Sequence, residues 1–186
     1  MAGGKSSRMK QDKALLPFGN YKSLAEYQYR RFSSYFDTVY ISAKSNKFDF
    51  DVEIIEDRYD KSSPLVSLVS IFESIEEKEV FILSVDAPFV STQTIEKLYT
   101  EAENESSVII AESTNGVEPL CGIYRHSILD TAKKFLSEDN HRLQALLKSL
   151  HTQKIAINHN EFMNLNHPFE YEEAKSYLVS LPSVNI

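Results

Sequence analysis

The sequence contains one cysteine, Cys121, and only five glycines among its 186 residues. A single cysteine excludes a disulfide within the chain and is typical of proteins in reducing compartments. With five scattered histidines, it offers none of the paired spacings of a structural zinc site. No apolar run approaches the ~20 residues of a membrane-spanning helix, and we see no signal peptide. We therefore expect a cytoplasmic protein that does not enter a membrane.

Positive charge is also scarce. The chain has 20 Lys and Arg residues against 27 Asp and Glu, a formal net charge of −7 at pH 7. This balance argues against a protein that coats nucleic acid or a membrane surface through bulk electrostatics. Apolar residues make up 42 % of the chain and charged residues 25 %, as in ordinary globular proteins. The length is that of one domain, which we assign to residues 1–186.

Two common phosphate-binding motifs, GxxxxGK[ST] and GxGxxG, are absent. The first residues nevertheless form a loop rich in hydrogen-bond donors, AGGKSSRMKQDK at Ala2–Lys13. Gly3 and Gly4 allow backbone N–H groups to turn toward an anion, while Arg8 and Lys13 bring positive charge. This composition predicts local capture of a small polyanion. The structural alternative is a solvated N-terminal tail.

Apolar runs and amphipathic segments alternate along the rest of the chain. Strands are expected where apolar or β-branched residues follow one another, and helices where apolar residues recur at three and four. This alternation predicts a three-layer, doubly wound α/β domain with a mostly parallel sheet. The expected strands are Thr38–Ser42, Val52–Ile55, Val80–Val85, Ser107–Ala111, Leu120–Tyr124 and Thr152–Ile157; the expected helices are Lys22–Phe36, Leu65–Ile75, Thr92–Glu103, Ile128–Leu136, Leu143–Leu150 and Phe169–Leu178.

The first of these helices has one aromatic face. Helical spacing groups Leu24, Tyr27 or Gln28, Arg31 and Phe32 on that face. We therefore expect a surface helix that packs through aromatic side chains.

Asp86 directly follows the apolar strand at Val80–Val85. Ligands of open α/β sheets bind beyond the carboxyl ends of the strands, and Pro88 holds the residue before it extended. A carboxylate beside bound phosphates is repulsive unless a divalent cation lies between them. We therefore interpret Asp86 as a Mg²⁺ ligand. The structural alternative is an Asp that caps a helix or turn.

Five blocks, in order along the chain, resemble the bacterial molybdenum cofactor guanylyltransferases, a nucleotidyltransferase family. They are Gly3–Leu16, Ile55–Asp57, Ser63–Leu65, Val85–Pro88 and Asn164–Pro168. The resemblance implies a Rossmann-like nucleotidyltransferase fold. It also implies transfer of GMP from GTP to the phosphate of molybdopterin cofactor, with release of pyrophosphate. Mg²⁺ is the implied cofactor, and molybdenum-insertion proteins and molybdoenzyme chaperones are implied partners.

The resemblance also implies roles for individual residues. Asn164 and Asn166 alternate with Leu165, so they point to one side of an extended segment, and the resemblance places them on the molybdopterin side of the site. Their structural alternative is a helix N-cap region. The implied catalytic residues are Arg8, Lys13 and Asp86, with Asp86 as metal ligand; the implied nucleotide contacts are Ala2, Gly3, Gly4, Lys13, Ser42, Asp57 and Asp86.

Several positions depart from the family pattern. Lys10 replaces a glycine, Ser42 stands where some relatives carry Asn, and Ser63 and Ser67 occupy the glycine sites of Gly-Pro-Leu-Ala-Gly. These changes affect base selectivity more than reaction class. In the family an apolar strand precedes the glycine loop, so we also expect that a first strand before residue 2 is missing from the sequence.

Three other functions stay open. Two are enzymatic: cytidylyl transfer to the same cofactor, and nucleotidyl transfer to a sugar phosphate. The third is a non-catalytic, nucleotide-binding regulatory protein, which the serine substitutions favour and the combination of Arg8, Lys13 and Asp86 disfavours. No histidine or glutamate near the motifs is a convincing general base. A cofactor phosphate is already ionised at neutral pH, so the guanylyl transfer needs none.

Overall fold

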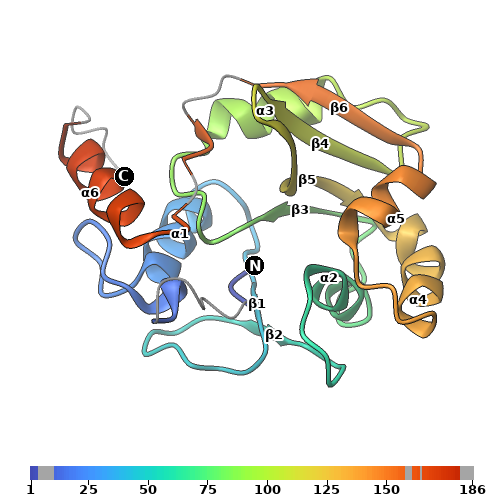
Figure 1. Ribbon diagram of the computed structural model, residues 1–186, viewed down its shortest axis with the longest axis horizontal. Coiled ribbons are helices and arrows are strands. Elements are labelled where there is room, and N and C mark those ends of the chain that lie inside the picture. The colour runs from blue at the N-terminus through green and yellow to red at the C-terminus, as the bar shows by residue number, and fades with distance from the viewer. Residues whose placement is uncertain (4–10, 158–160, 164, 181–186) are drawn as a thin grey trace.

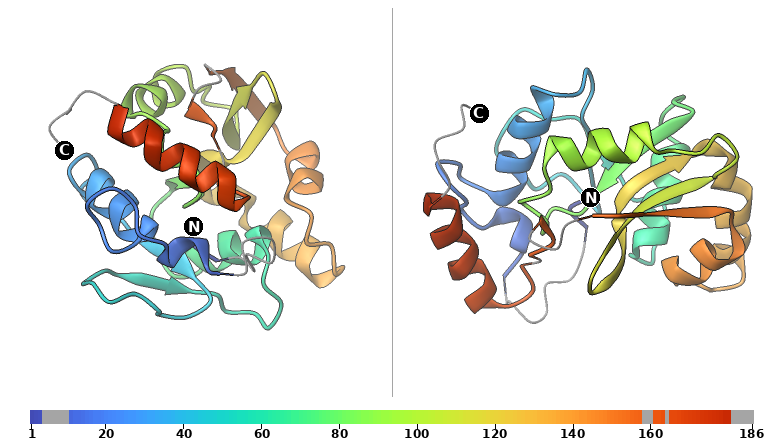
Figure 2. Two further views of the ribbon diagram at one scale, coloured as in Figure 1. Left: turned by 60° about the vertical axis from the view of Figure 1, so that its left-hand side comes forward. Right: turned by 90° about the horizontal axis from the view of Figure 1, so that it is seen from above.

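The computed structural model describes residues 1–3, 11–157, 161–163 and 165–180. Helices lie on both sides of a central layer of strands (Figures 1 and 2). The described helices are α1 (Leu24–Ser33), α2 (Pro64–Phe72), α3 (Thr92–Thr100), α4 (Leu129–Ser137), α5 (Leu143–Ser149) and α6 (Pro168–Ser180), with 3₁₀ turns η1 (Lys13–Leu15) and η2 (His126–Ile128). None of these helices has the length and apolar character needed to cross a membrane.

Within the described residues, the strands form two sheets. β1 (Ile41–Ala43) and β2 (Ile54–Glu56) pair in parallel, and the other sheet has the order β3-β5-β4-β6. β5 runs antiparallel to β3 and β4, while β4 and β6 are parallel. The predicted α/β class is confirmed, with one reversed strand that the alternation of elements does not reveal. The strands of the second sheet are β3 (Glu79–Leu83), β4 (Val108–Ser113), β5 (Gly116–Arg125) and β6 (Thr152–Ala156).

Strand β4 shows why the strands of the second sheet carry apolar residues on both faces. Val108 and Ile110 pack with α2, α4 and α5 in one core cluster. Ile109 and Ala111, which alternate with them, pack with α1 and α3 in another. Side chains alternate across a strand, so a strand covered on both faces reads as a continuous apolar run. The two clusters are the two interfaces of a three-layer fold.

Met1 and Ala2 connect the two sheets. The amino group of Met1 donates to the Leu83 carbonyl at 2.6 Å, and Val85 N–H donates to the Met1 carbonyl at 3.0 Å. Bonds to the residues on either side of Ser84 are the pattern of a parallel pair. On the other side, Ala2 N–H donates to the Ser42 carbonyl at 2.7 Å.

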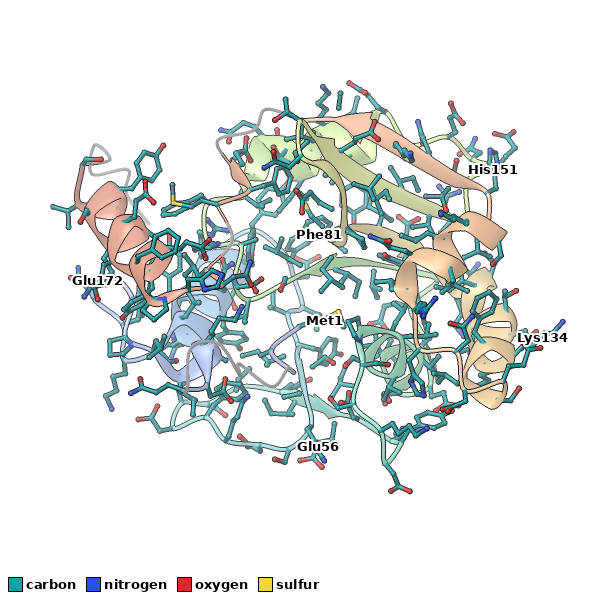
Figure 3. The ribbon with its side chains drawn as sticks, in the orientation of Figure 1. Met1, Glu56, Phe81, Lys134, His151 and Glu172 are labelled. Atoms are coloured by element: carbon teal, nitrogen blue, oxygen red, sulfur yellow. The ribbon has the colours of Figure 1, made fainter. Side chains whose placement is uncertain are left out.

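A cavity of about 380 Å³ opens beside Met1, lined by residues of β1, β3 and α1. Figure 3 shows Met1 near the centre of the molecule, below Phe81 on β3. Burial lowers the pKa of the Met1 amino group to about 6. The strand that we expect before residue 2 stays a prediction.

A third packing cluster brings α6 against α1. Phe18 is buried, and its ring packs edge-on against Tyr27 of α1 at a centroid distance of 5.0 Å. Leu165 and Ala174 join this cluster from the C-terminal part of the chain, and Val85 borders it from the end of β3. The cluster therefore holds together three segments that carry predicted site residues.

Gly122 of β5 tests the packing of the four-stranded sheet. A Cβ at this position would lie 2.3 Å from the Ile109 carbonyl oxygen and 2.8 Å from Cγ2 of Ile110. We expect Gly122→Ala to lower the free energy of unfolding by about 3 kcal/mol. For a chain of this length, that equals a fall in Tm of about 6–12 °C. Thermal unfolding of the variant measures the effect, with Ser176→Ala, at an exposed position of α6, as the control. An unchanged Tm would contradict the close approach of β5 and β4.

Candidate active site

Lys13 connects the three segments that pack together through Phe18, Val85 and Leu165. It stands at the start of η1, and its ammonium group lies 2.5 Å from Oδ2 of Asp86 and 3.1 Å from Oδ1 of Asn166. The side chains of Lys13 and Asp86 are only 16 % and 19 % exposed. Partial burial strengthens the attraction between opposite charges and makes either charge costly to leave alone. Residues predicted separately as phosphate ligand, metal ligand and substrate contact therefore lie in one cluster.

Asp86 is held at the exit of β3 by neighbours on both sides. The Ser84 hydroxyl donates to Oδ1 of Asp86 at 2.5 Å, so the two carboxylate oxygens have different partners. The backbone carbonyl of Asp86 accepts from Leu165 N–H at 3.1 Å. This backbone bond fixes the Asn166 segment beside the carboxylate.

Asn166 also belongs to the N-terminus of α6. Glu170 sits in the first turn, and its Oε2 accepts from the N–H groups of Asn166 at 2.6 Å and His167 at 2.7 Å. A carboxylate that satisfies the unpaired N–H groups at a helix start stabilises that end. The segment therefore has the helix-cap role of the structural alternative, and its place on the molybdopterin side stays a prediction. The backbone of Asn166 belongs to a helix cap, and its side chain reaches Lys13.

Gly3 and Asp57 form a second part of the site. Asp57 follows β2, and its N–H donates to the Ala43 carbonyl at 3.0 Å. Buried Ser67 of α2 donates from its hydroxyl to Oδ1 of Asp57 at 2.8 Å. A Cβ placed on Gly3 would lie 3.9 Å from Oδ2 of Asp57. The start of the glycine loop thus runs past Oδ2 of Asp57, which accepts a longer bond of 3.5 Å from the Ser62 hydroxyl.

Ser42 lies on β1 beside this pair. Its side chain is buried, and within the described part of the chain its hydroxyl oxygen has no hydrogen-bond partner. Its backbone carbonyl accepts from Ala2 N–H. Ser42 therefore positions Ala2 through its backbone carbonyl, and its hydroxyl takes no part in this contact.

Two further charged residues, to which the sequence assigned no role, support the loop. Asp12 caps η1 by accepting from Ala14 N–H at 3.0 Å. Lys47 pairs with the other oxygen of Asp12 at 2.5 Å and donates to the Ala2 carbonyl at 3.1 Å. Lys47 thus links both ends of the glycine loop, a role that no local motif marks because the contacts are remote in sequence.

Not every predicted residue can be placed. Gly4, Arg8 and Asn164 lie outside the described residues. The structure brings together Lys13, Asp86 and Asn166, and separately Gly3, Ala2, Ser42 and Asp57, with Met1 between the ends of β1 and β3. Both groups lie at the carboxyl ends of strands, where open α/β sheets bind ligands.

Comparison with known proteins identifies the family. The family model of the MobA-like NTP transferase domain matches residues 1–155. The chain belongs to this family. It is a nucleotidyltransferase, as its sequence predicted.

Relatives from two bacteria resemble nearly the whole chain. A protein of Campylobacter jejuni subsp. doylei is 37 % identical over 181 residues, covering 96 % of this chain and 94 % of its own. One from Helicobacter pylori is 36 % identical, covering 96 % and 90 %. Both are named molybdenum cofactor guanylyltransferase. The predicted resemblance to that family is therefore confirmed.

A solved structure shows the same fold. It is that of molybdopterin-guanine dinucleotide biosynthesis protein A from Archaeoglobus fulgidus, which superimposes with a TM-score of 0.83 and covers 97 % of each chain at 19 % identity. At this identity the likeness concerns the fold alone. The nucleotidyltransferase fold predicted from the sequence is confirmed by it.

Lys13 offers a direct test of the cluster. Lys13→Met keeps the side-chain length but removes the cation beside Asp86, so we expect nucleotidyl transfer to fall about 100- to 1,000-fold. Lys22→Met is the matched control, because Lys22 pairs with Asp49 on the exposed surface, where ion pairs contribute little. Pyrophosphate release measures both rates. Equal rates for the two variants would remove Lys13 from the catalytic set.

Proposed function

We propose that this protein transfers GMP from GTP to the terminal phosphate of molybdopterin cofactor and releases pyrophosphate. The observation that carries the proposal is the cluster of Lys13, Asp86 and Asn166 at the end of β3. It lies in a chain of the MobA-like NTP transferase family. The names of the relatives support guanylyl transfer as the reaction.

The chemistry requires charge stabilisation more than proton transfer. A phosphate oxygen of the cofactor attacks the α-phosphorus of GTP, and a new P–O bond forms. The bond from the α-phosphorus to the bridging oxygen breaks, and its electron pair leaves with pyrophosphate. The attacking oxygen is already ionised, so no protein base is needed. The Lys13 ammonium, with Arg8 as a second cation, would stabilise negative charge on the phosphates.

The oxygen atoms around Lys13 fit a magnesium site. Oδ2 of Asp86 and Oδ1 of Asn166 both contact one ammonium group, so the cluster already accommodates a cation. Among the described residues no three His, Cys, Asp or Glu side chains gather as a metal site. A single carboxylate completed by substrate phosphates and water is a common arrangement for Mg²⁺. Asp86 would hold the ion, which when bound neutralises phosphate charge.

We assign the nucleotide to the second part of the site. Asp57 would accept from ribose or base, and the backbone of Ala2, Gly3 and Gly4 would lie along the nucleotide. Ser42 would contact it through its hydroxyl, which has no partner within the described residues. Asn164 and Asn166 would face the molybdopterin.

The setting of the reaction follows from its substrates. GTP and molybdopterin cofactor would be the two substrates, and molybdenum-insertion proteins and molybdoenzyme chaperones would be the further partners. We place the reaction in the cytoplasm.

Burial raises the pKa of the Cys121 thiol, so this cysteine is a packing residue of β5.

Asp86→Asn tests the metal role. The change removes the negative charge with little change in volume, so we expect turnover to fall about 1,000-fold while the fold is retained. The measurement is pyrophosphate release with Mg²⁺, GTP and molybdopterin cofactor, with circular dichroism as the check on folding. Asp49→Asn, at an exposed Asp, is the control. A rate within a few-fold of the unchanged protein at limiting Mg²⁺ would refute the role of Asp86.

Base selectivity separates guanylyl from cytidylyl transfer. Guanine offers O6 as an acceptor and N1–H and N2–H₂ as donors. A site with buried partners for these groups should reject cytosine and adenine by ~10⁴-fold. Parallel rates with GTP, CTP and ATP, and the mass of each product, measure this preference. Equal or greater efficiency with CTP would reassign the protein to cytidylyl transfer.

A further inference from the structure

The segment after Asp86 is fastened to helix α1 through its carbonyl groups. Gln28 donates from Nε2 to the Ala87 carbonyl at 3.0 Å. The Arg31 guanidinium donates to the Pro88 carbonyl at 2.5 Å and the Val90 carbonyl at 2.9 Å. Two side chains one helical turn apart therefore bind three carbonyls of residues 87–90.

These residues need such support because they form no helix or strand. Pro88 has no N–H group, and Ala87 N–H makes a 3.2 Å bond back to Ser84. Buried backbone carbonyls must find donors. A guanidinium binds two carbonyls with a rigid, planar set of donors, whereas a lysine ammonium is a point charge on a flexible stem. Arg31 thus fixes the direction in which the chain leaves Asp86.

Arg31 is also fixed itself. Its guanidinium lies 4.3 Å from the centroid of the Phe32 ring, and burial lowers its pKa. Within the described residues no carboxylate pairs with it. Tyr27 and the charge of Glu161 offset part of the effect of burial on the pKa, but keeping a largely desolvated cation without a paired carboxylate is costly.

We propose that Arg31, assisted by Gln28, is a positioning residue that holds the Asp86 carboxylate in the geometry that binds the metal–nucleotide complex. The proposal rests on the function proposed above, because that function assigns Asp86 as the metal ligand. On the amino-terminal side, β3 and the Ser84 hydroxyl hold Asp86. On the carboxyl-terminal side, Phe32 of α1 packs in one apolar cluster with Ala87 and Val90, and in the described residues Gln28 and Arg31 supply the side-chain hydrogen bonds from α1.

Three variants test this role, each measured at a temperature where thermal unfolding shows it to be folded. Arg31→Met removes all guanidinium bonds, Arg31→Lys keeps the charge, and Gln28→Met removes the amide donor. The matched control is Arg30→Met, since the neighbouring Arg30 is 46 % exposed and lies 3.8 Å from Glu26 on the outside of α1. The readouts are kcat, KM for GTP, the Mg²⁺ concentration for half-maximal activity, and Mn²⁺ binding with GTP alone, followed by electron paramagnetic resonance.

We expect Arg31→Met to weaken Mn²⁺ binding and raise the half-maximal Mg²⁺ concentration by about 10- to 100-fold, as for residues that orient metal ligands. Arg31→Lys and Gln28→Met should show smaller shifts in the same direction, and Arg30→Met none. A lower Tm with unchanged metal binding in Arg31→Met would reduce Arg31 to a structural role. If Arg31→Met does not fold, Arg31→Lys and Gln28→Met decide, and wild-type metal binding in both overturns the proposal.

Failure of this inference is distinct from failure of the proposed function. If Asp86→Asn abolishes turnover while the Arg31 and Gln28 variants bind metal normally, the metal role stands and the positioning role is wrong. If Asp86→Asn keeps full turnover and metal binding, the proposed function of Asp86 fails first. In that case shifts in the Arg31 variants would not report on a metal site at Asp86.

Discussion

The ion pair of Lys13 and Asp86 is the contact on which the site depends. The two residues are 73 positions apart, and neither charge is well exposed. Without a ligand each satisfies the other, so the protein can keep a carboxylate and an ammonium group partly buried at the end of β3. A magnesium–nucleotide complex would supply a cation for Asp86 and phosphates for Lys13. Binding would therefore exchange one set of charge pairs for another, and neither residue would be left uncompensated.

The rest of the fold holds the segments that carry Lys13 and Asp86 next to each other. Phe18 follows η1, Val85 precedes Asp86, and Leu165 precedes Asn166, and all three belong to one apolar cluster. Burial of these neighbours is non-directional, but it leaves the adjacent polar residues little freedom to move. Directional precision comes from hydrogen bonds: Leu165 N–H to the Asp86 carbonyl and Glu170 to the start of α6. Apolar packing selects the segments that meet, and hydrogen bonds set their angles.

The sequence predicted the elements better than their partners. Every expected strand and helix is present, because apolar periodicity is a local property. The apolar run Leu120–Tyr124 reads the same in a parallel or antiparallel strand, so its pattern did not give the direction of β5. The signal was the short connection: Asn115-Gly116 is typical of a hairpin turn, and two residues between β4 and β5 are too few for a parallel crossover. The phosphate and metal assignments came from motifs, but the contact of Lys13 with Asp86 did not. Spacing placed Arg31 on the inner face of α1, yet its carbonyl partners lie almost 60 residues away.

The serines at family glycine positions illustrate how a substitution can fit a site. A side chain at Ser63 or Ser67 takes space that a glycine would leave open. In the structure Ser63 caps α2, and its hydroxyl also meets Nδ1 of His141 at 3.1 Å. The Ser67 hydroxyl turns toward Asp57 and binds only Oδ1. This bond restrains the carboxylate with Oδ2 toward Gly3, where the Ser62 hydroxyl also reaches it at 3.5 Å. A substitution that narrows the site therefore also orients the acceptor within it.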